Sequence, residues 1–275
     1  MNYILKTEKL NFSYMDGTKA LKELSMKIPE GKKIAVIGNN GSGKTTLFLH
    51  FNGIHRPQSG NIFYRDKKMS YSSGEIKNIR KNVGIVFQDP DNQLFSGSVY
   101  QDISYGPVNL GWDEKEIRKK IEEVMNQTGT FDLKDKPTHF LSYGQKKRVA
   151  IAGVLAMNPE VMILDEPTAG LDPVFTSQIM ELLNDLNKKG TTVIISSHNM
   201  DEVFSWADYV FVLSQGEIIS EGKPEELFRD PEVLKKANLK KPWVIDMYDY
   251  LLNKGLATVG DNIPRTRDEL LKLIK

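Results

Sequence analysis

Short runs of consecutive apolar residues, rich in β-branched and aromatic side chains, recur along the chain. Runs of this length fit strands that are buried on both faces of a parallel sheet, with helices between them. Such strands are expected at residues 33–37, 83–87, 161–164, 191–196 and 209–213. Residues 10–14 and 24–28 alternate between apolar and polar positions instead, which predicts antiparallel β structure near the N-terminus.

Caps and apolar spacing predict several helices. Asp172 and Pro173 suit the start of a helix whose apolar residues keep helical spacing and which ends at Gly190. Reciprocal capping boxes are expected at three further helix starts: Asn199 with Glu202, Asp113 with Glu116, and Thr266 with Glu269. The pattern is mostly helical between Phe95 and Met157, and prolines interrupt it beyond Gly222. These features predict a helical insertion in a sheet domain, followed by a tail of short helices.

Composition excludes several classes of protein. The chain has 275 residues, 40% of them hydrophobic, which suits one large domain or one domain with an appendage. With 37 basic and 36 acidic residues the net charge is +1, so neither a nucleic-acid partner nor disorder is indicated. The absence of Cys excludes disulfides and suits a reducing cytosol. Because the apolar runs fall short of the roughly 18 residues of a membrane span, we expect a soluble chain.

The segment Gly-Asn-Asn-Gly-Ser-Gly-Lys-Thr-Thr follows the first expected parallel strand and opens an apolar helix. It fits the pattern Gly-x₄-Gly-Lys-Thr of a phosphate-binding loop, whose backbone N–H groups close on the phosphates of a nucleotide. Lys44 is placed to reach the β and γ oxygens, and the Thr45 hydroxyl is placed to bind Mg²⁺. The candidate nucleotide-binding residues are Asn39, Asn40, Gly41, Ser42, Gly43, Lys44, Thr45 and Thr46.

Two adjacent acids end the buried strand expected at 161–164. Asp165 is placed to hold Mg²⁺, and Glu166 is a candidate general base that polarises an attacking water. An acidic turn before Pro167 is the simpler interpretation of this stretch by itself. Paired with the phosphate loop, the second acid favours a hydrolase over a protein that only binds nucleotide.

Residues 141–145, Leu-Ser-Tyr-Gly-Gln, form a second candidate anion site. They precede a helix-patterned segment at 148–157, and such a helix start offers free backbone N–H groups and the positive end of the helix dipole. The chain therefore carries two candidate anion sites, the phosphate loop and this turn. The pattern of residues does not by itself explain why one chain has two.

Together these motifs resemble those of the ATP-binding subunits of ABC transporters. The resemblance covers residues 4–222, and its motifs follow the order of the family: Tyr14, 38–46, Gln88, 141–145, 161–167, 169–172 and His198. It implies an α/β fold, a P-loop NTPase of the ABC type with a mainly parallel sheet core. An N-terminal antiparallel β subdomain, a helical subdomain at about 96–157, and a helical C-terminal extension at 223–275 are expected around the ATPase domain of residues 1–222.

The resemblance also accounts for the second anion site. In that family two subunits pair head to tail, and the signature turn of one subunit closes on the γ-phosphate held by the other. Ser142, Gly144 and Gln145 match that turn and would act on partner-bound ATP, whereas Tyr143 stands where the family usually has Gly. The second subunit is expected to be another copy of this chain or a related ATPase.

Four single residues receive roles only through the resemblance. Tyr14 would stack on adenine, rather than simply pack in the sheet. Gln88 would touch Mg²⁺ or the attacking water, and His198 would contact the γ-phosphate and orient the base. Asp172 would act across the subunit interface, although it also suits a helix N-cap. The basic residues 146–148 are expected to form a solvated helix face.

Two stretches beyond the common motifs, 88–95 and 106–111, are similar to the ATPases of energy-coupling-factor importers, which take up vitamins and transition metals such as cobalt. Residues 146–157 are also similar to the cobalt/nickel branch. This implies an ATP-hydrolysing subunit on the cytoplasmic side of the cell membrane. It would dock on a transmembrane coupling protein and work with a substrate-capture membrane protein. The alternatives are the ATPase of another ABC importer or exporter, or a soluble ABC ATPase without a transport role.

Two groups of apolar residues have two possible interpretations each. One group would contact the coupling protein or pack inside the helical insertion: Leu94, Phe95, Tyr105 and Val108. The other would pack back on the main domain, which we favour, or mediate self-association: Trp243, Tyr248, Tyr250 and Leu251.

Overall fold

The computed structural model describes residues 2–260 and 262–275, and its larger sheet has the strand order β10-β9-β3-β8-β7-β6. Five of these strands are parallel: β3 (Lys33–Ile37), β6 (Val83–Val86), β7 (Val161–Leu164), β8 (Thr192–Ser196) and β9 (Tyr209–Ser214). The edge strand β10 (Glu217–Gly222) runs antiparallel to β9. The five predicted parallel strands are confirmed, whereas β10, whose apolar side chains are those of Ile218 and Ile219, was not predicted.

The continuous apolar runs are explained by two cores, one on each face of this sheet. In β3, Ile34 and Val36 belong to the core shared with the second sheet, and Ala35 and Ile37 belong to the core shared with the helices. Successive side chains of a strand point to opposite faces, so a strand with a core on both sides has no polar face.

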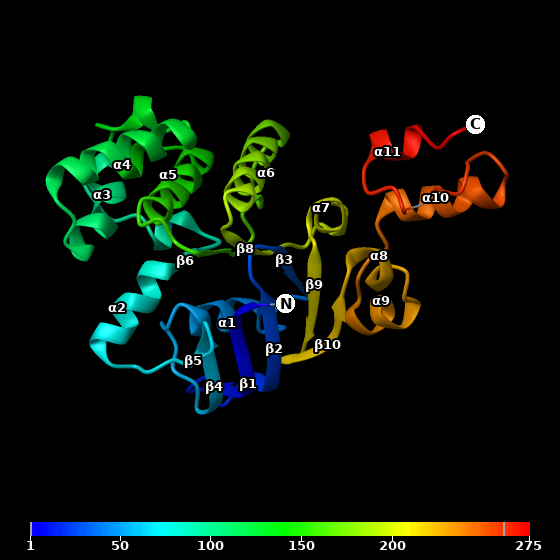
Figure 1. The fold of residues 1–275 in the computed structure, drawn as a ribbon, viewed down its shortest axis with the longest axis horizontal. Coiled ribbons are helices and arrows are strands. Elements are labelled where there is room, and N and C mark those ends of the chain that lie inside the picture. Colours follow the sequence, from blue (N-terminus) through cyan, green and yellow to red (C-terminus); the bar gives the residue numbers. More distant parts are fainter. Residues whose placement is uncertain (1, 261) are drawn as a thin grey trace.

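A second sheet of four antiparallel strands lies below the first in Figure 1, in the order β2-β1-β4-β5. Its strands are β1 (Tyr3–Ser13), β2 (Lys19–Pro29), β4 (Ser59–Tyr64) and β5 (Lys67–Lys68). The helix α1 (Lys44–Phe51) contributes Leu47, Phe48 and Phe51 to the core between the two sheets. The predicted antiparallel structure is confirmed, and it forms a sheet of its own. The sequence patterns did not predict β4, β5 or the following helix α2 (Ser73–Asn82).

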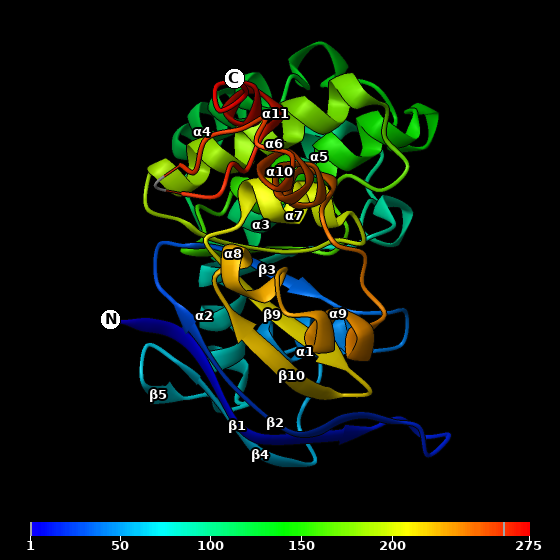
Figure 2. The same cartoon turned by 90° about the vertical axis from the view of Figure 1, so that its right-hand side faces the viewer.

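Helices cover the opposite face of the large sheet (Figures 1 and 2). The segment expected to be helical contains α3 (Val99–Leu110), α4 (Glu114–Gln127) and α5 (Tyr143–Leu155), with short 3₁₀ turns at Phe131–Leu133 and Thr138–Phe140. A third such turn precedes it at Pro90–Asn92. The helices α6 (Pro173–Lys188) and α7 (Met200–Trp206) follow β7 and β8. Helix α5 begins five residues before the predicted position 148.

The predicted reciprocal capping boxes are wrong, although each predicted N-cap is correct. Asn199, Asp113 and Thr266 accept hydrogen bonds from backbone N–H groups at their helix starts. Glu202 instead accepts from two side-chain hydroxyls, and Glu269 accepts from the N–H of the residue before the cap. A reciprocal box forms at Ser142 and Gln145, which explains the early start of α5.

The C-terminal residues form the helices α8 (Pro224–Leu227), α9 (Pro231–Ala237), α10 (Trp243–Asn253) and α11 (Arg267–Leu271). Tyr248 is buried and belongs to the helix-side core, and Leu251 packs against it. This confirms the predicted packing for these two residues, while Trp243 and Tyr250 remain about half exposed. Among the helices of the described residues, none combines the length and the apolar character needed to cross a membrane.

Candidate active site

A glycine-rich loop connects β3 to α1 at the carboxyl edge of the large sheet. At Gly38 the φ angle is +147°, and a Cβ atom would lie 2.1 Å from the carbonyl oxygen of Leu213. At Gly43 the φ angle is +106°, and a Cβ atom would lie 2.6 Å from the carbonyl oxygen of Ala20. Glycine is therefore required at both positions for the loop to close tightly.

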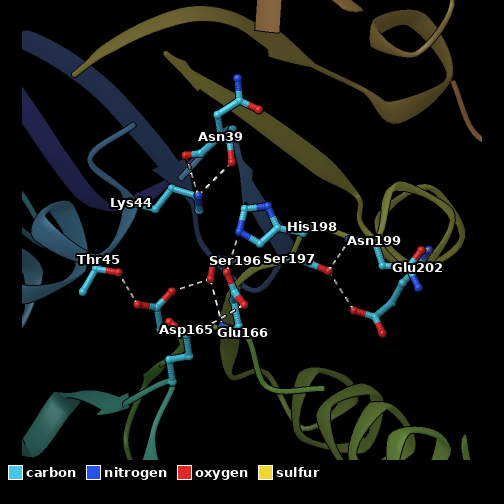
Figure 3. A network of polar contacts seen from close by, with 12 residues as sticks. Asn39, Lys44, Thr45, Asp165, Glu166, Ser196, Ser197, His198, Asn199 and Glu202 are labelled. Carbon is cyan, nitrogen blue, oxygen red and sulfur yellow. Dashed lines mark hydrogen bonds and ion pairs between the residues drawn. The ribbon is translucent and has the colours of Figure 1, made fainter. Parts of the chain in front are cut away.

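The interior of this loop is suited to an anion. The Lys44 ammonium donates to the carbonyl oxygens of Gly38 and Asn39, at 2.7 and 3.1 Å (Figure 3). Burial lowers the pKa of Lys44, while the carboxylates of Glu166 and Asp165 act in the opposite direction. Within the described residues, the buried Ser42 hydroxyl has no hydrogen-bond partner. A buried cation and an unpaired hydroxyl inside a glycine loop fit the phosphates of a nucleotide.

Asp165 lies directly beside the start of α1. Its Oδ2 accepts a hydrogen bond from Thr45 Oγ1, and its Oδ1 accepts one from Ser196 Oγ, both at 2.5 Å. The loop, Asp165 and Ser196 stand at the carboxyl ends of β3, β7 and β8, which are neighbours in the sheet. Parallel strands bring such residues to one edge, where ligands usually bind. Sequence reasoning missed Ser196, although its position at the end of an expected buried strand was a usable signal.

Glu166 is held by three groups from different parts of the chain. Its carboxylate accepts a hydrogen bond from Gln88 Nε2 at 3.1 Å and lies 2.6 Å from His198 Nε2. Its backbone N–H donates to Ser196 Oγ at 2.9 Å. The Glu166 side chain is 15% exposed and that of His198 is 43% exposed. The structure therefore brings together Glu166, Gln88 and His198, as the sequence predicts for catalysis.

Tyr14 lies just beyond the end of β1 and is joined to the phosphate loop. Its hydroxyl is 2.8 Å from Thr46 Oγ1, and its ring packs edge-on against Phe12. The residue is 40% exposed. An aromatic ring that is exposed beside a phosphate loop can stack on a nucleotide base, which packing within the sheet would not allow.

The residues that are predicted to act on a partner subunit form their hydrogen bonds locally. Within residues 2–260 and 262–275, no hydrogen bond connects Ser142, Gly144, Gln145 or Asp172 to the phosphate loop. Ser142 and Gln145 bond to each other across the start of α5. Asp172 accepts from two backbone N–H groups at the start of α6. Its predicted capping role is confirmed.

The expected solvated face at 146–148 is wrong. Lys147 is completely buried, and its ammonium donates to the carbonyl oxygen of Gln88 at 2.6 Å. Lys146 forms an ion pair with Asp91, and Arg148 donates to a backbone carbonyl. The reason is tertiary, because the first turns of α5 pack against the turn that follows β6.

Comparison with known proteins assigns the chain to a family. Residues 21–169 match the family model described as ABC transporter. The chain is 53% identical over 274 residues to the energy-coupling factor transporter ATP-binding protein EcfA3 of Clostridium perfringens, covering 99% of this chain and 96% of the relative. It is 50% identical to EcfA of Methanocaldococcus jannaschii, covering 95% and 92%.

Solved structures agree with these sequence matches. One is the structure of cbiO1 from Clostridium perfringens, which is part of the ABC transporter complex cbiONQ. It matches with a TM-score of 0.76 and 52% sequence identity, and the match covers 92% of this chain and all of that one. The ATP-binding cassette MJ0796, solved as a dimer bound to ADP and Pi, has a TM-score of 0.74 and 28% identity, covering 80% and 99%.

The chain therefore belongs to the ABC transporter family of ATPases. Relatives that are about half identical to it over nearly its whole length include ATP-binding proteins of energy-coupling factor transporters. Both the resemblance to ABC ATPases and the more specific resemblance to energy-coupling-factor ATPases are confirmed.

Proposed function

We propose that this chain is the ATP-binding and ATP-hydrolysing subunit of a membrane importer of the energy-coupling-factor type, for cobalt or nickel or for a vitamin. The single observation that carries hydrolysis is the placement of Glu166. Its carboxylate lies between Gln88 and His198, next to the acid that bonds to the phosphate loop. A second acid held in this way is not needed for binding Mg²⁺ and nucleotide, and it suits a general base.

In this proposal each residue of the candidate active site has a defined role. Lys44 and the backbone of residues 39–46 bind the phosphates of ATP, and Tyr14 stacks on adenine. Glu166 accepts the proton of the attacking water, and His198, at 2.6 Å, holds the carboxylate in place and contacts the γ-phosphate. Gln88 orients the water from the other side of Glu166.

The residues also fit Mg²⁺. Thr45 supplies a hydroxyl and Asp165 supplies a carboxylate within 2.5 Å of each other, and Gln88 carries a carboxamide nearby; oxygen ligands of this kind are the ones that Mg²⁺ prefers. When bound by Thr45, Asp165 and Gln88, Mg²⁺ would neutralise negative charge on the phosphates of ATP. Ser196 orients Asp165 for this role.

We infer that two subunits close around ATP head to tail, either two copies of this chain or this chain and a related ATPase. Ser142, Gly144 and Gln145 would then bind the nucleotide of the partner, and Asp172 would reach across the interface. This is consistent with the absence of hydrogen bonds between these residues and the phosphate loop of their own chain, within the part that the structure describes. It also gives the second anion site a purpose.

A membrane partner would dock on the helical segment. Leu94 is partly buried against the core, but Phe95, Tyr105 and Val108 are each more than half exposed. The rings of Phe95 and Tyr105 pack edge to face at 4.7 Å, so they form one apolar surface. We propose that this surface contacts a transmembrane coupling protein on the cytoplasmic side of the cell membrane, and that a substrate-capture protein completes the importer.

No nucleic acid is expected as a partner. We retain residues 1–222 as the ATPase domain, with its helical subdomain at about 96–157, and 223–275 as its extension.

The hydrolytic role is tested by Glu166→Gln. Loss of the carboxylate removes the general base, so the rate of phosphate release should fall about 10²–10⁴-fold. ATP should still bind, and the unhydrolysed nucleotide should hold a dimer together on a sizing column. Glu217→Gln, at an exposed acid of β10, is the matched control and should behave as the unmodified chain. Undiminished hydrolysis would refute the role of Glu166, and a persistent monomer in saturating Mg-ATP would count against the head-to-tail dimer.

A further inference from the structure

Gln88 connects helix α5 to the proposed general base. Its backbone carbonyl accepts two hydrogen bonds from α5, one from Lys147 Nζ at 2.6 Å and one from the Tyr143 hydroxyl at 3.1 Å. Its side chain donates to Glu166 Oε2 at 3.1 Å. A continuous series of contacts therefore runs from the first turns of α5, through a single residue, to the carboxylate that would activate water.

Lys147 fixes one end of this series. It is completely buried, and within the described residues no carboxylate lies within ion-pair distance of it. Burial lowers the pKa of Lys147 to about 8, while the more distant carboxylates of Asp165, Glu166 and Asp89 favour its charged form. A buried ammonium is costly unless its donors are used, and this one donates to the Gln88 carbonyl.

Tyr143 reaches the same carbonyl from the start of α5, at the position where the family usually has Gly. Its ring fills the space beside the turn that leads to α6, because a Cβ atom on Gly170 would lie 3.2 Å from Tyr143 Cε1. The neighbouring Gly144 faces Leu171 on the same turn. Tyr143 is thus braced on one side by this turn, and its hydroxyl points to Gln88. A glycine at position 143 could form neither contact.

We propose that Tyr143 is a positioning residue for ATP hydrolysis. Together with Lys147 it fixes the backbone of Gln88, so that the Gln88 carboxamide stays on Glu166. The proposal rests on the proposed hydrolytic function. It gives the aromatic residue in the signature turn a role within its own chain, in addition to whatever the turn does for a partner.

The test is Tyr143→Phe, which removes the hydroxyl and leaves the ring against Gly170. Because one neutral hydrogen bond typically contributes about 0.5–1.5 kcal/mol, kcat should fall about 2- to 12-fold. The KM for ATP should change little, since the hydroxyl contacts Gln88 and not the phosphate loop. Tyr250→Phe, at a half-exposed tyrosine of α10, is the matched control and should retain the kcat of the unmodified chain.

A double-mutant cycle separates positioning from a general structural effect. Gln88→Ala removes the carboxamide and leaves the backbone carbonyl, so both contacts from α5 remain possible. If Tyr143 acts through the Gln88 side chain, Tyr143→Phe should lower kcat no further in the Gln88→Ala background. Thermal unfolding of each variant measures folding independently of hydrolysis.

Each outcome decides the matter. An unchanged kcat in Tyr143→Phe, or an equal loss with and without the Gln88 side chain, would overturn the positioning role and leave the hydrolytic function standing. A loss accompanied by a matching rise in KM would also overturn it, because the hydroxyl would then act in binding. If the unmodified chain hydrolyses no ATP, the proposed function fails first and the positioning role fails with it.

Discussion

The backbone of Glu166 adopts an unfavourable conformation, and this conformation positions its side chain. Its φ angle is +47°, in the left-handed region that residues with a Cβ atom rarely adopt, at a cost on the order of 1–3 kcal/mol. Ser196 stabilises this conformation, since its Oγ accepts the Glu166 N–H while it donates to Asp165. The strained turn aims the two acids differently: Asp165 points to Thr45, and Glu166 points to His198 (Figure 3). The carboxylate of Glu166 also accepts the hydrogen bond from Gln88.

His50, on α1 behind the phosphate loop, should make the protein less stable in acid. It is fully buried with Nδ1 2.7 Å from the Thr46 carbonyl oxygen, and burial lowers its pKa from 6.5 to about 4. Between these values the unfolded chain binds a proton that the folded chain does not. The free energy of unfolding should therefore fall by about 2–3 kcal/mol on this account as the pH drops from 6.5 to 4.

Urea unfolding at pH 7 and pH 4.5 measures this contribution. His50→Gln cannot take up the proton, so it should lose less stability over that interval than the unmodified chain. His139→Gln, at an exposed histidine, should lose as much as the unmodified chain. An identical pH dependence in His50→Gln would show that His50 does not carry the effect.

At the scale of elements, the starts of α5 and α6 carry the predicted interface residues. Ser142 caps α5 through a reciprocal box with Gln145, and Asp172 caps α6 with Pro173 in the first turn. Both starts lie against each other, because Gly144 faces Leu171 and Tyr143 faces Gly170. Local capping thus fixes the two turns that each subunit of the proposed dimer would present to the other subunit.

Two substitutions of Asp172 separate its structural role from its proposed role across the interface. Asp172→Asn keeps a side-chain oxygen for capping, so the free energy of unfolding should stay within a few tenths of a kcal/mol, whereas Asp172→Ala should cost about 1 kcal/mol. Both should reduce phosphate release if the carboxylate acts on the partner. Full activity in Asp172→Asn would confine this residue to capping α6.

At the scale of the whole molecule, the candidate active site and the proposed docking surface lie on different parts of the fold. The phosphate loop, Asp165, Glu166 and His198 gather at its carboxyl edge, while Phe95, Tyr105 and Val108 lie exposed on the helical segment. The stretch from Gln88 to Phe95 joins the two, since one end contacts Glu166 and the other carries the exposed ring. A partner at the apolar surface would therefore be close along the chain to the hydrolysis site.

Purification of the tagged chain from its own membranes in mild detergent tests this arrangement. Mass spectrometry should identify a multi-span coupling protein and a separate substrate-capture protein. Phe95→Ser should lose both, because it removes an apolar contact, and Phe131→Ser, another exposed aromatic of the helical segment, should retain them. A conventional permease pair would instead assign the chain to another kind of ABC transporter. Recovery of no membrane protein would contradict the transport role.

The sequence by itself determined the parallel strands, the phosphate loop, the two acids and the family. A continuous apolar run predicts a strand that is buried between two cores. Loop motifs consist of neighbouring residues, so their spacing can be recognised in the sequence. The helix starts at Asp172 and Asn199 also depend on neighbouring residues and were predicted. The reciprocal capping boxes were not predicted correctly, because Glu202 and Glu269 accept hydrogen bonds from other donors in the folded chain.

Only the tertiary structure decided what depends on residues far apart in the chain. Lys147 belongs to a run that has the composition of a solvated face, yet it is buried because α5 packs on the turn after β6. Ser196 became part of the site because β8 lies beside β7, and Tyr143 acquired a partner 55 residues away. Strand order and helix packing bring such residues into contact, and no local pattern records them.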